Sequence, residues 1–191
     1  MLDVIGAVES HLRSTIGGPD PVRASVTFVG VQPVDVLRFG PDSERVVRYV
    51  TLGCSRQPMG DPDAMLTEVV AGPRAELMLA LRGGVDGAAR SMAILAATPA
   101  VEGLVLQEDS LVDLQEPLWP GSAFGAVILG SSGVANLELG GPLDPVMFLQ
   151  AVPVTATEAA WVRLRGAQAL RDAWAEAGVD IRDPGRSAVS L

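Results

Sequence analysis

The stretch VMFLQAVPVTATEAAWVRLRGAQAL, residues 146–170, contains the clearest structural signals in the chain. Residues 146–154 carry apolar side chains on both faces of an extended segment, which is typical of a strand in the middle of a sheet. The tetrapeptide TATE follows, and it fits a capping box with Thr155 as the N-cap and Glu158 at the third helical position. The pattern therefore predicts a central strand that leads directly into a long C-terminal helix, which stops at Gly178. The expected apolar stripe of that helix is Ala160, Leu164, Ala167, Leu170 and Trp174.

The segments before this stretch predict more strands and two further helices. Alternating or continuous apolar residues indicate strands at 22–29, 34–39, 45–52, 74–81, 111–115 and 124–130. The turn GPDSE joins the second and third of these strands as a hairpin. An amphipathic helix begins the chain and ends at Gly17-Gly18-Pro19, and a middle helix starts after Gly83-Gly84 with Asp86 as its expected cap.

These elements together predict an α+β fold. We expect a mostly antiparallel or mixed sheet covered by an N-terminal helix, a middle helix and a long C-terminal helix. A chain of 191 residues is long enough for one domain with a substantial core, and no linker divides it. We expect a single domain over residues 1–180 and a flexible C-terminal tail over residues 181–191.

The composition limits the classes of partner. The chain has 23 acidic and 14 basic residues, a formal net charge of −9, and every basic residue is arginine. Because nucleic-acid binding requires neutralisation of phosphates, this balance argues against it and favours a basic protein partner. The absence of lysine excludes a P-loop lysine and a Schiff-base lysine. The absence of lysine, together with abundant Ala, Gly, Val and Arg, is typical of a protein from a bacterium with a GC-rich genome.

The N-terminal sequence and the apolar runs indicate a cytoplasmic protein. The first residues, MLDVIGAVESHL, contain acidic groups and no basic region of the kind that begins a signal peptide. The longest apolar runs are shorter than the roughly 18 residues that a membrane-spanning helix needs. We expect no interaction with a membrane.

The sequence contains few residues of the types that usually act as catalytic nucleophiles, bases or metal ligands. The single cysteine, Cys54 in VTLGCSRQPM, would need a histidine as base, and the single histidine, His11, lies on the face of the first helix. Cys54 is therefore interpreted as a small packing residue. One cysteine and one histidine cannot form a zinc site of the usual type. An all-carboxylate Mg²⁺ or Ca²⁺ site stays open, with Asp61 and Asp63 as the best local candidates, although the chain lacks the spacing of an EF-hand loop. No cofactor is predicted.

The loop after Cys54 and a tryptophan in a later loop are the candidate binding elements. The segment SRQPMGDPDAMLTEVVAGP connects two expected strands, and an irregular connection of this length is usually functional or mobile. Trp119 lies between two prolines in EPLWPGSAFG, where it either packs on the core or belongs to a binding surface.

The order of several elements resembles the suppressor of fused domain. The matching elements are Tyr49 and the strand that leads into Gly53-Cys54-Ser55, then Glu76-Leu77, and then Met147 to Val154 followed by Thr155 and Glu158. The resemblance implies a mixed α/β fold without catalytic activity. In the eukaryotic proteins, this domain is one half of a clamp that holds an extended peptide of GLI-type transcription factors by strand addition. This chain stops about where the first half ends, so the Hedgehog role is not transferred.

The resemblance also suggests which residues contact a partner. Tyr49 and Asp61 match an aromatic residue and an acid near the peptide site of the family. With Arg56, Met59 and Trp119 they form the predicted partner-binding set. Bacterial relatives of the domain look like components of toxin–immunity loci, where a small acidic protein neutralises a toxin by binding it.

We therefore predict a non-catalytic protein-binding module, of the immunity type or of a related type. Its expected partner is a protein or an extended peptide with basic character. The alternative is an enzyme that uses carboxylates and arginines with Mg²⁺, for which Arg38, Arg56, Asp61 and Glu116 are the candidates. The oligomeric state stays open.

Overall fold

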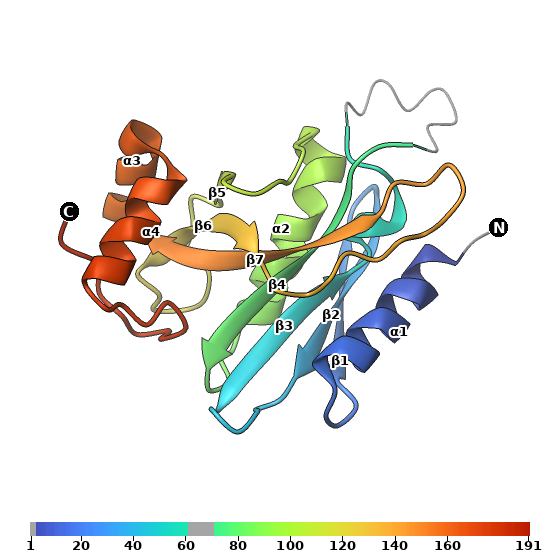
Figure 1. Ribbon diagram of the computed structural model, residues 1–191, viewed down its shortest axis with the longest axis horizontal. Coiled ribbons are helices and arrows are strands. Elements are labelled where there is room, and N and C mark those ends of the chain that lie inside the picture. The colour runs from blue at the N-terminus through green and yellow to red at the C-terminus, as the bar shows by residue number, and fades with distance from the viewer. Residues whose placement is uncertain (1–2, 61–70) are drawn as a thin grey trace.

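The computed structural model describes residues 3–60 and 71–191. The protein is built around a seven-stranded sheet with helices on both faces (Figure 1). The predicted residues Asp61 and Asp63 lie outside the described residues. In chain order the elements are α1 (Val4–Ile16), β1 (Val22–Phe28), β2 (Val31–Phe39), β3 (Val46–Leu52), the short 3₁₀ helix η1 (Cys54–Arg56), β4 (Arg74–Arg82), α2 (Ala88–Glu102), β5 (Leu111–Asp113), β6 (Phe124–Ser131), β7 (Val146–Thr155), α3 (Ala156–Arg165) and α4 (Ala167–Glu176).

The sheet is mixed, as predicted. Its order is β1-β2-β3-β4-β7-β6-β5, and every neighbouring pair is antiparallel except β4 and β7. The parallel pair aligns Arg74 with Val146 and Met78 with Gln150. The predicted hairpin is confirmed as β2 and β3, and the apolar strand β7 lies between β4 and β6. The α+β prediction is confirmed.

Strand β7 shows how the helices divide between the two faces. Phe148 packs with Val8 and Leu12 of α1, and Val152 and Val154 pack with α3 and α4. These even-numbered residues of β7 share one face, because side chains alternate along a strand. Its odd-numbered residues 147, 149 and 151 belong to the cluster that contains Met92 and Leu95 of α2. Helix α2 therefore covers one face, while α1 and the C-terminal helices cover separate parts of the other (Figure 1).

The predicted long C-terminal helix is two helices. Gly166 has φ +86° and ψ 167°, which is not helical, so α3 ends and α4 begins there. The break changes which residues face the core. Leu164 is 79% exposed and Ala160 is also exposed, which contradicts their place in the predicted stripe. Beyond the break, Ala167, Leu170 and Trp174 are buried as predicted.

The helix termini confirm one predicted cap and correct another. Thr155 and Glu158 form both hydrogen bonds of the capping box at the start of α3. Asp86 does not cap the middle helix. Gly87 occupies the N-cap position of α2 with φ +90°, a left-handed conformation that suits glycine, and this cap supplies no side-chain hydrogen bond.

The C-terminal segment 181–191 folds back against the α3–α4 layer. Arg186 is 8% exposed, and both of its terminal nitrogens donate to the carboxylate of Glu158, at 2.7 and 3.1 Å. Its guanidinium also lies over the rings of Phe124 and Trp174, at 4.9 and 5.1 Å from their centroids. Val189 is buried beside it. Part of the segment predicted as a flexible tail thus belongs to the core in this structure.

Among the described residues, no helix is both long enough and apolar enough to cross a bilayer.

Candidate functional site

A buried carboxylate on the neighbouring strand accepts the hydrogen bonds that stabilise a short turn after β3. Glu76, on β4, is fully buried, and four donors converge on it. Thr51 Oγ1 donates at 2.6 Å, Ser55 Oγ at 2.6 Å, and the backbone N–H groups of Gly53 and Ser55 at 2.8 and 3.0 Å. Gly53 has φ +140°, which only glycine adopts without strain. The conformation of residues 53–55 is therefore set by one side chain of the neighbouring strand.

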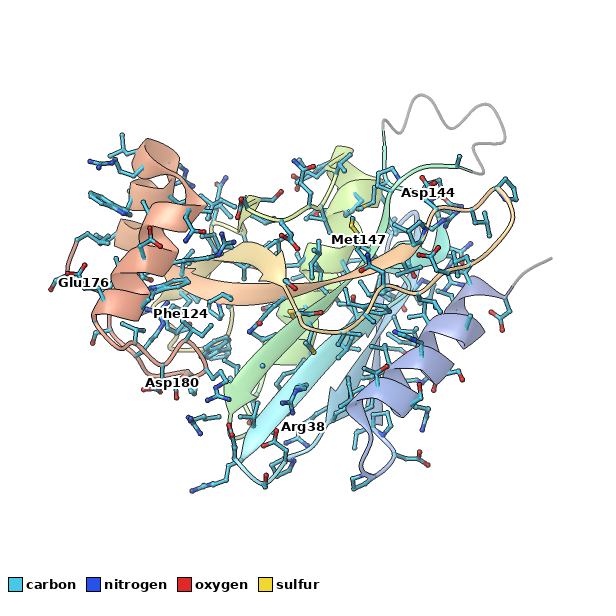
Figure 2. All side chains as sticks on the ribbon, viewed as in Figure 1. Arg38, Phe124, Asp144, Met147, Glu176 and Asp180 are labelled. Atoms are coloured by element: carbon cyan, nitrogen blue, oxygen red, sulfur yellow. The ribbon has the colours of Figure 1, made fainter. Side chains whose placement is uncertain are left out.

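A buried arginine fixes the next part of the turn. Arg74 lies two residues before Glu76 on β4, and its Nη1 donates to the carbonyl oxygens of Ser55 at 2.8 Å and Arg56 at 3.0 Å. Burial lowers the pKa of Arg74, and the nearby charge of Asp144 opposes that shift. Asp144 also accepts a hydrogen bond from the backbone N–H of Gly72 at 2.8 Å. Figure 2 places Asp144 and Met147 at this end of the sheet.

Cys54 lies inside this turn, in surroundings that disfavour its thiolate. Its side chain is half-buried and packs against the core that α2 covers. Burial, with the neighbouring charge of Glu76, raises the pKa of the Cys54 thiol well above its usual value, so the nucleophilic thiolate is disfavoured. His11 stacks on Phe148 with centroids 5.3 Å apart, and its Nε2 bonds to the carbonyl of Ala135 at 2.8 Å. Both observations favour packing roles.

A groove of about 260 Å³ opens beside the turn. Its walls come from three places: Gly30 with the start of β2, the segment 53–59 and the C-terminal half of α2. Arg56 and Gln57 are exposed at the groove, and Met59 lines it while only 5% of its surface is exposed. The thioether of Met59 accepts a hydrogen bond from the N–H of Leu106 at 3.3 Å. We name this feature the turn groove, and its lining residues are Gly30, Val31, Gln32, Val34, Gly53, Cys54, Arg56, Gln57, Pro58, Met59, Ala96, Ala97, Pro99 and Ala100.

The structure separates the predicted partner-binding residues. Arg56 and Met59 meet in the turn groove, and Asp61 lies outside the described residues. Tyr49 is 3% exposed, and its hydroxyl donates to the carbonyl of Val85 at 3.2 Å and accepts from the N–H of Val85 at 2.9 Å. Trp119 is 7% exposed. Tyr49 and Trp119 therefore have packing roles in this structure.

The contacts of Trp119 show why it is buried. Its ring meets the ring of Phe124 edge to face, with centroids 5.7 Å apart. The carbonyl oxygen of neighbouring Leu118 accepts a hydrogen bond from the hydroxyl of Ser91 on α2. The loop that carries Trp119 is thus attached to α2.

Several residues of the turn groove escaped the sequence prediction. They include Gln57 and the small helix residues Ala96, Ala97 and Ala100. Gln57 follows Arg56 directly and was within reach of a prediction based on the loop. Alanine in a helix carries no signal for a groove, because the groove arises only when the helix packs beside the turn.

The described residues of the alternative enzyme hypothesis, Arg38, Arg56 and Glu116, lie in separate places, and Asp61 lies outside the described residues. Arg38 faces Tyr49 in the β2–β3 ladder, and a Cβ atom at Gly84 would lie 2.8 Å from its Nη2, at the opposite end of β3 from the turn (Figure 2). Glu116 lines a different cleft, with Asp113 and Arg163. Within residues 3–60 and 71–191, no group of three or more metal-ligating side chains is found.

This chain resembles known proteins both in sequence and in fold. The family model described as "Suppressor of fused protein (SUFU)" matches residues 30–187. The chain belongs to the suppressor of fused family. A crystal structure of a SUFU homologue from Neisseria gonorrhoeae FA 1090 has a TM-score of 0.72 and 18% identity, with 99% of this chain and 98% of that chain covered. No curated protein sequence matched.

Two further solved structures of the suppressor of fused family share the fold. A chain in the crystal structure of the Sufu–Fu complex has a TM-score of 0.70 and 14% identity, with 97% of this chain and 91% of that chain covered. Drosophila Suppressor of Fused has a TM-score of 0.71 and 13% identity, and the match covers 98% of this chain and 51% of that one. The resemblance inferred from the sequence is confirmed.

The matched elements of the suppressor of fused family act as structural units in this chain. Ser55 and Glu76 are hydrogen-bonded to each other, and Thr155 and Glu158 form the capping box that also receives Arg186. Ser55 and Glu76 are 21 residues apart in the sequence and meet in space, whereas Thr155 and Glu158 are 3 residues apart at the start of α3. Their physical role is to build the turn and the start of α3.

Proposed function

We propose that this chain is a non-catalytic protein-binding module that recognises its partner at the turn groove. The observation that carries the proposal is the contrast between the floor and the rim of that groove. The floor is fixed by Glu76 and Arg74, which are 0% and 4% exposed and bond to residues 53–56. The rim presents exposed Arg56 and Gln57. A rigid base that supports exposed polar side chains loses little entropy on binding.

The family supports a role in protein binding. One member of the suppressor of fused family is known from its complex with Fu. The turn groove is lined by a loop and by a helix, and we infer that an extended segment of a partner lies between them. Arg56 offers a planar donor group for a carboxylate or a carbonyl oxygen of that segment.

We further propose that binding neutralises the partner, as an immunity protein does. The net charge of −9 supports this proposal, because an acidic surface accelerates encounter with a basic partner. Arg56 would then act as a local specificity contact within an acidic surface, rather than as the source of the long-range attraction.

The test is affinity capture from the lysate of the native host with chemical crosslinking. We expect wild-type protein to capture a specific partner and an Arg56→Glu variant to lose it. Arg165→Glu is the matched control, because Arg165 is also an exposed arginine but lies on α3. Loss in the first variant and retention in the control support the turn groove. Equal retention in both variants contradicts it.

A further inference from the structure

We propose that the cleft between α3 and the connection from β5 to β6 binds a free α-amino acid with an apolar side chain, through the ammonium and the carboxylate of that ligand. This site is separate from the turn groove, so the inference does not depend on the proposed function. Three properties of the cleft support it: its size, its apolar floor and the opposite charges at its rim.

The cleft is large enough for a small molecule and has a volume of about 280 Å³. Residues from β5 to the start of β6 form one side, and Ala156, Ala159 and Arg163 of α3 form the other. Helix α3 packs against β6 and β7, at the side of the sheet where β5 is the last strand (Figure 1). Pockets for drug-sized ligands usually have volumes of roughly 300–1,000 Å³, so this cleft suits a smaller ligand. We name it the α3 cleft.

The floor of the α3 cleft is apolar. Phe124 and Ala126 of β6 and Ala159 of α3 line it, and all three residues are buried. The alanine side chains end at Cβ, which leaves room above them for an aliphatic or aromatic group. An apolar side chain of a ligand would gain free energy by leaving water for this floor.

Arg163 supplies a positive charge at the rim. Its Nη2 donates to Asp113 at 2.5 Å, and within residues 3–60 and 71–191 this is the only hydrogen bond of its guanidinium. Asp113 also accepts from the backbone N–H of Gln115 at 2.9 Å, which fixes the carboxylate that orients Arg163. A guanidinium has five N–H donors, so the remaining ones are available to the carboxylate of a ligand.

Glu116 supplies a negative charge at the same rim. Its side chain is exposed and lines the cleft, and its carboxylate makes no ion pair or hydrogen bond with the described part of the chain. Because Asp113 is already paired with Arg163, Glu116 is the group for an ammonium. A ligand that carries both an ammonium and a carboxylate would therefore pair with both sides of the rim.

The charges also distinguish an α-amino acid from other small ligands. An amino acid with an apolar side chain has no net charge at neutral pH, so the net charge of −9 does not repel it as it repels an anion. An amine without a carboxylate would give Arg163 no new partner, and a carboxylic acid without an ammonium would leave Glu116 unpaired. A metal ion is disfavoured, because the described residues contain no group of three or more metal-ligating side chains.

The experiment is an NMR titration with L-valine, L-leucine and L-phenylalanine, each compared with its amide and its N-acetyl form. The amide lacks the carboxylate, and the N-acetyl form lacks the ammonium. We expect the amino acids to shift the backbone amide signals of Gln115 and Gly125 and to leave that of Gly53, in the turn groove, unchanged. Each modified form should bind about tenfold or more weakly, because one charged group of the rim then stays unpaired.

Matched variants test the position of the site. Ala156→Leu fills the cleft from an exposed position and should abolish binding, while Ala160→Leu is the control, since Ala160 is exposed on the same helix outside the lining. Arg163→Gln and Glu116→Gln should each weaken binding about tenfold or more, and Arg165→Gln should not. Urea unfolding of each variant establishes that its folding is intact.

Four results would overturn the proposal. The first is the absence of shifts at Gln115 and Gly125 with all three amino acids at millimolar concentration. The second is an amide that binds as tightly as its parent, which would assign the cleft to simple cations. The third is an N-acetyl form that binds as tightly as its parent, which would assign it to carboxylic acids. The fourth is equal loss in Ala156→Leu and Ala160→Leu, which would place binding elsewhere.

Discussion

Two buried carboxylates in this protein are stabilised by different kinds of partner. Glu76 and Glu158 are both fully buried. Glu76 receives hydrogen bonds from two hydroxyl groups and two backbone N–H groups, all neutral. Glu158 receives the capping hydrogen bonds of Thr155, the indole N–H of Trp174 and the guanidinium of Arg186.

The two carboxylates also differ in how far along the sequence their hydrogen-bond partners lie. The donors of Glu76 belong to residues 51–55, so this side chain shapes one turn and prepares a surface. Glu158 binds Arg186, which is 28 residues later, and also accepts from the N–H of Val189 at 3.2 Å. Glu158 therefore attaches the end of the chain to the start of α3. One carboxylate organises a candidate site, and the other closes the fold.

The largest effect should come from removing the cation that neutralises Glu158. We expect Arg186→Ala to lower the free energy of unfolding by about 3–5 kcal/mol, because an uncompensated charge stays buried. Urea unfolding followed by circular dichroism measures this loss. The double variant Arg186→Met with Glu158→Gln should recover part of the stability, since neither charge remains. If the single and double variants are equally unstable, the ion pair is not what makes Arg186 important.

The second-largest loss of stability should come from changing Glu76, the carboxylate with neutral donors. Glu76→Gln keeps the shape but turns an amide NH₂ toward donors, and we expect it to lower the free energy of unfolding by about 1–3 kcal/mol. It should also weaken partner binding at the turn groove. Glu102→Gln, on the surface, is the control and should change stability by no more than about 0.5 kcal/mol. A Glu76→Gln protein as stable as this control would show that the turn does not depend on the carboxylate.

The smallest effect should be a difference in acid sensitivity. Burial acts to raise the pKa of Glu158, but the hydrogen bonds from Arg186, Thr155 and Trp174 with the charge of Arg186 outweigh it, so the pKa is lowered. A carboxyl group whose pKa is lower in the folded state than in the unfolded state stabilises the folded protein. This stabilisation is fully present above the pKa of the unfolded state, about 4.3, and is lost as the pH falls through the lower pKa of the folded state. Wild-type protein should therefore lose stability below about pH 4.3 more steeply than Glu158→Gln does.

The pH comparison needs thermal unfolding curves of both proteins at several pH values between neutral and acidic. Other carboxylates, such as Asp42 and Asp180, also have lowered pKa values through their arginine partners, so both proteins should become less stable in acid. Only the difference between the two proteins reports on Glu158. Parallel curves would contradict the lowered pKa of this group.

Sequence by itself determined the features that depend on neighbouring residues. The seven strand segments follow from side-chain alternation, the start of α3 follows from Thr155 and Glu158, and the middle position of β7 follows from apolar residues on both faces. The family resemblance was also available, since its elements occur in a fixed order. The strand and capping signals lie within a few residues, where backbone geometry and side-chain period are linked, whereas the family resemblance rests on the order of elements along most of the chain.

Only the tertiary structure decided the features that depend on distant contacts. Gly166 lies within a helical pattern, and only the structure shows that α3 ends and α4 begins there. The family resemblance suggested Tyr49 as a partner contact, and the sequence left Trp119 open between the core and a binding surface; in the structure the Tyr49 hydroxyl bonds to Val85 and the Trp119 ring packs on Phe124. The burial of Arg186 and the α3 cleft arise from residues far apart in the chain. Burial and exposure are properties of the whole packed assembly, because each side chain is covered by elements that the local sequence does not specify.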